Sequence, residues 1–143
     1  MTSRSGRVIV EEGPGWRFSL DRTRETHALL LAGEDWAAEF TLQEGHDLAR
    51  AAADLEREWS RCSANLMPEE ELCLELERGE LWVQLEGCRQ QRTLRFVLTP
   101  AQPGRRGVEG AWHGAATRAL MASLRLLRQG ALTDAGGVDA SPV

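Results

Sequence analysis

The chain has 143 residues, 42% of them hydrophobic, and a formal net charge of −5. A chain of this size is one ordinary domain and buries roughly 68–70% of its unfolded surface, enough for a core without disulfides or metals. No apolar run approaches the ~20 residues that span a bilayer, and the start of the chain lacks the apolar segment of a secretory signal. The odd set Cys62, Cys73 and Cys88 predicts reduced thiols in a cytoplasmic protein.

Charge is unevenly distributed along the chain. Every basic residue is arginine, and residues 88–130 hold eight arginines against a single acid, Glu109. Residues 1–87 hold nine arginines against nineteen acids. Such an asymmetry can mark a surface for an anionic partner. The alternative is that the basic third pairs with the acidic part inside one fold.

The first residues predict a pair of strands. Residues 1–6 are small and polar, and we expect them to be disordered. Apolar runs predict strands over 7–12 and 16–20, separated by a Gly-Pro-Gly turn, the strongest breaker chemistry available.

A second strand pair and a helix follow. Residues 27–32 and 35–42 alternate around a Gly-Glu turn, which places Leu31 opposite Trp36. Thr41-Leu42-Gln43-Glu44 matches a capping box, in which the threonine and glutamate side chains satisfy free backbone N–H groups. The helix then carries one apolar stripe, formed by Leu48, Ala52, Leu55, Trp59 and Cys62.

Residues 72–87 give the firmest prediction, a β-hairpin. Leucine and valine alternate with polar residues on both sides of Arg78-Gly79, and a turn at that dipeptide places all the apolar side chains on one face. The expected pairs are Leu76 with Leu81, Leu74 with Val83, and Leu72 with Leu85.

The rest of the chain repeats the same order. Strands are predicted over 92–99 and 108–112, a loop over 100–107, and a helix over 114–129. Residues 131–143 hold few apolar residues and are expected to be a disordered tail. The apolar stripe of the second helix is Ala116, Leu120, Leu124 and Leu127.

Together these elements predict a single α+β domain over 7–130, built as a twofold β-β-β-β-α repeat of antiparallel sheets with two helices. The pattern Gly13-x-x-Trp16 recurs as Gly79-x-x-Trp82 in the second strand of each half.

Several segments resemble a known family. They are Arg7-Val8-Ile9, Glu12-Gly13-Pro14-Gly15-Trp16-Arg17, Gly33-Glu34-Asp35-Trp36-Ala37-Ala38-Glu39-Phe40, Leu94-Arg95-Phe96 and Gly110-Ala111-Trp112. Over roughly residues 7–128 the chain resembles a cyanobacterial family of small proteins catalogued as a domain of unknown function. The resemblance implies a fold similar to that of the Whirly proteins, single-stranded-DNA-binding transcriptional regulators. Those proteins use a lysine-containing motif, and this chain has no lysine, so no binding residue is carried over.

A nucleic-acid-binding surface can be predicted from the arginines and one tryptophan. Binding of a single strand needs cations along a groove and aromatic faces for stacking. Alternation places Trp82 away from the apolar face of its strand, whereas Trp16, Trp36 and Trp59 are expected in the core and Trp112 is undecided. The alternative for Trp82 is that a helix or the other half of the domain covers it. The candidate nucleic-acid-binding residues are Trp82, Arg89, Arg92, Arg95, Arg105 and Arg106.

Catalysis and metal binding are not predicted. The hairpin's polar face clusters Glu75, Glu77 and Glu80, with Glu77 opposite Glu80, and a solvated acidic face is the ordinary reading of such a cluster. The three histidines are far apart in sequence, and no cysteine pair has metal-binding spacing. We therefore expect no enzyme, no metal and no cofactor.

The sequence predicts a binding module. Its expected partner is single-stranded DNA or RNA, bound through the basic C-terminal third. The alternative is a protein–protein adaptor or assembly factor that binds no nucleic acid. The sequence leaves the oligomeric state open.

Overall fold

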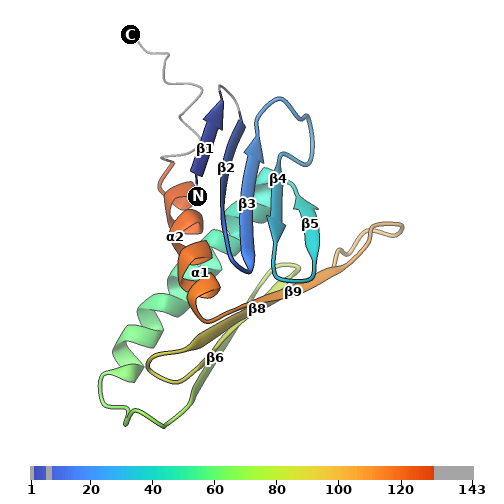
Figure 1. The fold of residues 1–143 in the computed structure, drawn as a ribbon. Coiled ribbons are helices and arrows are strands. Elements are labelled where there is room, and N and C mark those ends of the chain that lie inside the picture. Colours follow the sequence, from blue (N-terminus) through green and yellow to red (C-terminus); the bar gives the residue numbers. More distant parts are fainter. Residues whose placement is uncertain (1, 6–7, 131–143) are drawn as a thin grey trace.

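The computed structural model of the chain describes residues 2–5 and 8–130, which form two antiparallel sheets, each followed by a helix (Figure 1). The N-terminal sheet has its strands in sequence order: β1 (Thr2–Ser5), β2 (Val8–Gly13), β3 (Trp16–Asp21), β4 (Leu29–Ala32) and β5 (Ala37–Phe40). Helix α1 spans Leu42–Ser63. The C-terminal sheet and its helix are β6 (Leu72–Arg78), β7 (Leu81–Gly87), β8 (Arg92–Leu98), β9 (Val108–His113) and α2 (Ala115–Arg128).

The predicted α+β class and the twofold plan are confirmed, but the N-terminal sheet has one strand more than predicted. Thr2–Ser5, expected to be disordered, pairs with β2 as strand β1, with Thr2 opposite Glu11 and Ser5 opposite Val8. Without β1, the outer edge of β2 would expose unpaired backbone groups, and pairing with an edge needs no apolar side chains. The tail predicted over 131–143 lies outside the described residues.

The hairpin of β6 and β7 is confirmed, with a turn one residue later than predicted. Gly79 and Glu80 form the turn, and Gly79 has φ +63°. Leu76 therefore lies opposite Val83 and not opposite Leu81. The shift moves each partner by two residues, so the apolar side chains stay on the predicted face.

The hairpin of β4 and β5 differs from the prediction in the same direction. Its loop is longer than predicted and spans residues 33–36, because Ala32 pairs with Ala37. Within the loop, the N–H of Gly33 donates to the carbonyl of Trp36 at 2.9 Å. Leu31 consequently pairs with Ala38, and Trp36 lies in the loop instead of opposite Leu31. This places the Trp36 side chain where it can reach the C-terminal half.

Helix α1 begins as predicted. The hydroxyl of Thr41 accepts from the Glu44 N–H at 3.1 Å, and the Glu44 carboxylate accepts from the Thr41 N–H at 2.9 Å. The predicted stripe is buried as far as Trp59, whereas Cys62, in the last turn, is exposed. All four predicted stripe residues of α2 are buried.

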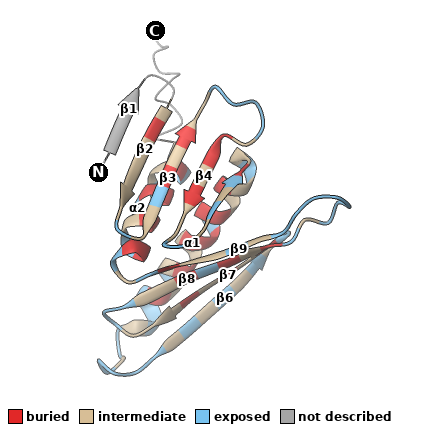
Figure 2. Cartoon of the chain, turned by 45° about the vertical axis from the view of Figure 1, so that its right-hand side comes forward, coloured by how far each residue is buried: buried red, intermediate tan, exposed pale blue. Residues whose placement is uncertain are grey.

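Both helices pack between the sheets and share one core. Helix α1 packs on β6, β7 and β5, α2 packs on β3, β9 and β8, and the helices pack on each other. In Figure 2 the buried residues gather where the helices meet the sheets. Within residues 2–5 and 8–130, no helix combines the length and the apolarity needed to cross a bilayer.

Two tryptophans join the halves reciprocally. The Trp36 indole N–H donates to the Ala111 carbonyl of β9 at 3.1 Å, and the Trp112 indole N–H donates to the Ala32 carbonyl of β4 at 2.8 Å. The two rings make an edge-to-face contact with centroids 5.1 Å apart. A side chain at Gly33 or Gly110 would overlap the Trp36 ring, so the close approach requires glycine at both positions.

The indole bond of Trp36 should be measurable as stability. Trp36→Phe leaves the Ala111 carbonyl without its donor, and we expect the free energy of unfolding in urea to fall by about 1–3 kcal/mol. Trp16→Phe is the matched control, because Trp16 is also partly buried and its indole has no partner among the described residues. Its loss should be less than half as large, and equal losses would contradict the account of the junction.

Candidate functional site

One side of the C-terminal sheet is not covered by a helix. Leu74, Leu85 and Leu94 point toward the helices, and the residues between them in sequence point away. We call the outward side the open face and define it by six side chains of β6–β9. They are Glu75, Glu77, Trp82, Glu86, Arg95 and Glu109.

Trp82 lies between carboxylates on the open face. In the strand register Glu77 is directly beside Trp82, and Glu109 lies two strands away on the other side, beyond Val97. The Trp82 indole N–H donates to the Glu75 carboxylate at 2.5 Å. Neither Glu77 nor Glu109 has an ion-pair partner among the described residues. The aromatic ring is therefore flanked by carboxylates that no arginine neutralises.

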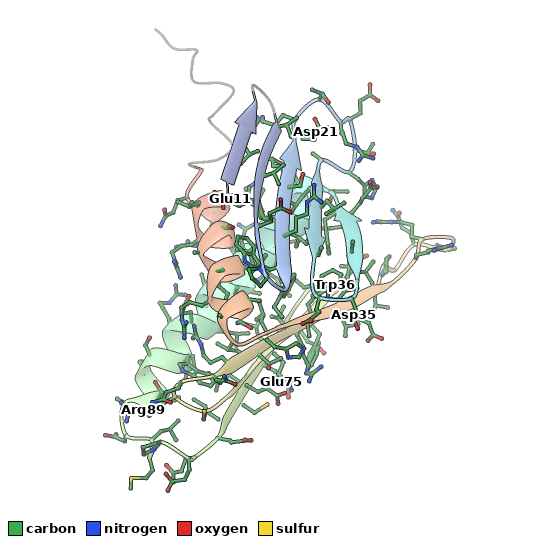
Figure 3. All side chains as sticks on the ribbon, in the orientation of Figure 1. Glu11, Asp21, Asp35, Trp36, Glu75 and Arg89 are labelled. Carbon is green, nitrogen blue, oxygen red and sulfur yellow. The ribbon has the colours of Figure 1, made fainter. Side chains whose placement is uncertain are left out.

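The open face is hollowed where it meets the loop between β4 and β5. The hollow has a volume of about 350 Å³ and is lined by Trp36 and Asp35 from that loop and by Trp82, Arg95 and Glu109 from the sheet. Figure 3 shows Trp36 and Asp35 at the junction of the sheets, with Glu75 on the lower sheet. We call this the tryptophan hollow. The other half of the domain thus flanks Trp82 without covering it, and Trp82 stays half-buried.

The structure places two of the six predicted residues together on the open face. They are Trp82 and Arg95, and the Arg95 Nε lies 3.5 Å from the Glu86 carboxylate. Arg92 is three residues before Arg95, so alternation turns it to the helix side of β8. There its guanidinium lies 5.6 Å from the centroid of the Trp59 ring and 3.4 Å from the Glu56 carboxylate, and only 15% of its side chain is exposed. Arg92 therefore stabilises the packing of α1 on the sheet.

The other three predicted residues lie in loops. Arg89 is in the turn between β7 and β8, where its guanidinium contacts the Leu66 carbonyl at 3.4 Å. Figure 3 shows Arg89 at the opposite end of the sheet from Trp36. Arg105 and Arg106 are in the loop between β8 and β9. The structure therefore separates the candidates Arg89 and Arg92 from Trp82 and Arg95.

The loop arginines line a second hollow, between the edge strands of the two sheets. This edge hollow has a volume of about 550 Å³. Its charged lining includes Arg105, Arg106, Glu39 and Glu44, and Arg105 pairs with Glu44 at 2.8 Å. It is separate from the tryptophan hollow, with which it shares no lining residue.

The basic third of the chain is partly neutralised within the fold. Four of its eight arginines form ion pairs with carboxylates of residues 1–87 in the described structure. Glu56 alone takes two of them, Arg92 at 3.4 Å and Arg125 at 3.1 Å. These contacts support the alternative reading, in which the charge asymmetry serves the fold.

The acidic cluster is arranged differently from the prediction. Glu77 faces Trp82, not Glu80, because the hairpin turn is shifted. Glu80 lies in the turn, where its carboxylate accepts from the Ala101 N–H at 2.9 Å. Sequence reasoning missed Glu109 as a neighbour of Trp82, although strand alternation already placed both outward. In the described part of the chain, no group of three or more His, Cys, Asp or Glu side chains could hold a metal ion.

Comparison with known families decides the relationship that the sequence suggested. A family model described as "Domain of unknown function (DUF1818)" matches residues 11–127. The chain belongs to this DUF1818 family. The comparison with curated proteins found no match.

A solved structure is similar to this DUF1818 protein. It is described as a protein with unknown function from the DUF155 family of Prochlorococcus sp. NATL2A, a cyanobacterium, and is 32% identical in sequence. The superposition has a TM-score of 0.77 and covers 82% of this chain and 96% of the other. The fold is therefore shared with a cyanobacterial protein over nearly all of that protein's length.

The cysteines of this DUF1818 protein report local electrostatics. Desolvation of the sulfur, followed by the carboxylates of Glu86 and Glu75, raises the pKa of Cys73, which lies on the same side of the sheet as the open face. The N–H groups of Gln90 and Gln91 lower the pKa of Cys88. Beside the desolvation of its own sulfur, Cys73 therefore reports the negative charge of Glu86 and Glu75 on the open face.

That potential can be tested by thiol titration. In a variant that retains only Cys73, the rate of reaction with iodoacetamide should reach its midpoint above the pH of an ordinary thiol, because desolvation of the sulfur and then the two carboxylates disfavour the thiolate. Glu86→Gln and Glu75→Gln should each lower the midpoint and speed the reaction at pH 8. Glu25→Gln, on a distant loop, is the control. A midpoint that changes in neither Glu86→Gln nor Glu75→Gln would show that the open face is not electrostatically negative at Cys73.

Proposed function

We propose that the chain is a non-catalytic binding module whose open face takes a basic segment of a partner protein. The observation that carries the proposal is the half-buried Trp82 with unneutralised carboxylates on either side, Glu77 and Glu109. A broad sheet surface suits contact with a macromolecule more than enclosure of a small reacting molecule.

The arrangement of Trp82 between Glu77 and Glu109 suits the side chain of an arginine or a lysine. A guanidinium stacks favourably on the face of a tryptophan ring, and tryptophan is the best of the aromatic residues for this contact. The same guanidinium can pair with a carboxylate beside the ring, and such charged hydrogen bonds are stronger than neutral ones. In a segment with spaced arginines, one guanidinium would stack on Trp82 and another would pair with Glu77 or Glu109.

Charge across the whole face favours the same partner. Its four carboxylates stand against one arginine, Arg95, which already contacts Glu86 at 3.5 Å. Opposite potentials on two surfaces speed their encounter and exclude partners of the wrong sign. A phosphate backbone would be repelled from this face.

Single-stranded nucleic acid remains a second candidate at a different place. Arg105 and Arg106 support it, since they lie together in an exposed loop beside the edge hollow. The order of the elements also supports a likeness to the Whirly proteins, which we include in the proposal. Fold likeness alone does not carry function.

The proposed partner chemistry can be tested with a fluorescein-labelled peptide that carries four arginines separated by serine and glycine. Anisotropy should show binding that weakens as salt is raised. Trp82→Ala should weaken the binding at least about tenfold, as expected for an aromatic hot spot. Trp82→Leu keeps an apolar strand residue and should weaken it similarly, which separates lost binding from lost folding.

The charge contribution needs a matched control. Glu77→Gln with Glu109→Gln should weaken binding and flatten its salt dependence. Glu25→Gln with Glu69→Gln makes the same change in net charge at exposed positions away from the open face and should leave binding unchanged. Equal binding by both double variants, or tighter binding of a single-stranded oligonucleotide lost with Trp82→Ala, would overturn the proposal.

A further inference from the structure

The edge hollow has the lining of a small-molecule site. It lies between β5, the last strand of the N-terminal sheet, and β9, the last strand of the C-terminal sheet. Its volume of about 550 Å³ falls within the roughly 300–1,000 Å³ typical of ligand pockets. Because β5 and β9 each pair on one side only, part of their backbone polar groups is free to face a ligand.

The apolar part of the lining comes from both halves of the chain. Ala37 and Ala38 of the edge strand β5 line one side, from opposite faces of that strand. Leu98 and Val108 from β8 and β9 line the other side, with Leu30 of β4 beside them. The small side chains of Ala37 and Ala38 leave room for the apolar part of a ligand beside the edge of β5.

The carboxylates of the hollow are already neutralised. The Glu39 carboxylate pairs with Arg24 at 2.9 Å. One oxygen of Glu44 accepts from the Thr41 N–H at 2.9 Å, and the other pairs with Arg105 at 2.8 Å. Both acids are therefore committed to contacts within the fold and offer little to a cationic ligand.

Arg106 is the cation left over. Its side chain is exposed in the lining, and it has no ion pair or hydrogen bond with any described residue. A guanidinium presents several N–H donors in a planar fork that matches a carboxylate, sulfonate or phosphate. The hollow thus combines an apolar floor with a single unneutralised positive charge.

We propose that the edge hollow binds a small organic anion with an apolar body, whose anionic group pairs with Arg106 and whose apolar body lies against the apolar lining. This site is independent of the open face, because the two hollows share no lining residue. The ligand class follows from the charge balance and the apolar residues of the lining.

The probe for this site is 8-anilinonaphthalene-1-sulfonate, an aromatic anion whose fluorescence rises in apolar surroundings. The folded protein should bind one equivalent in a saturable manner. Arg106→Ala should weaken binding at least about tenfold, the scale of one charge-assisted hydrogen bond. Ala37→Trp, at an exposed strand position, fills the hollow without changing charge and should abolish the signal.

Controls separate this site from general dye binding. Arg118→Ala removes another exposed arginine, on α2, that does not line the hollow, and this variant should bind the dye as the unaltered chain does. Benzoate should displace the dye. Equal binding by all three variants, or displacement by a single-stranded oligonucleotide and not by benzoate, would overturn the proposal. The peptide experiment on the open face uses a different probe and different variants. Its outcome therefore does not decide the outcome of the dye experiment, and each proposal can be contradicted alone.

Discussion

The structure depends on one junction, where each half of the chain supplies a tryptophan to the backbone of the other. Trp36 donates to Ala111 and Trp112 donates to Ala32, so two backbone carbonyls near the middle of the molecule obtain their donors across the boundary between the halves. A partly buried carbonyl that loses this donor costs stability, which favours the two halves unfolding as one cooperative unit. Phe96 stacks on Trp112 with centroids 5.6 Å apart and extends the aromatic contact into β8.

This junction also shapes the surface. It holds the loop between β4 and β5 against β9, so Asp35 and Trp36 form one wall of the tryptophan hollow (Figure 3). The same approach of the two halves brings the edge of β5 near the end of β8, which creates the edge hollow. The two candidate sites are thus consequences of how the repeated halves meet. Neither half alone supplies all the residues that line either hollow.

Charge is sorted by the same arrangement. Arg92, on the helix side of β8, and Arg125 of α2 both pair with Glu56 of α1. The outward side of the C-terminal sheet keeps its carboxylates. An acidic total charge with a basic third therefore becomes a fold whose arginines partly stabilise helix packing, and whose open face is acidic. The mean charge of a segment is a poor guide to a surface, because alternation divides neighbouring residues between two environments.

Local chemistry was predictable from the sequence, and contacts between the halves were not. The capping box of Thr41 and Glu44 and the outward placement of Trp82 follow from short-range rules, and both are confirmed. Arg92 and Arg95 were both candidates for one binding surface, yet their odd spacing puts them on opposite faces of β8. Trp36 was expected in a strand, and only the longer loop frees it to bond with β9. Loop length is set by the tertiary contact, which no local pattern encodes.

The most direct test of the account is fluorine NMR of the protein labelled with 5-fluorotryptophan. The chain has five tryptophans, so each contributes one resonance that its own substitution assigns. When the arginine peptide is added, the account predicts that the Trp82 resonance shifts with saturation while those of the buried Trp59 and Trp112 stay in place. A static Trp82 resonance with the peptide bound, or a shift confined to the buried tryptophans, would contradict the claim that the open face is the binding surface.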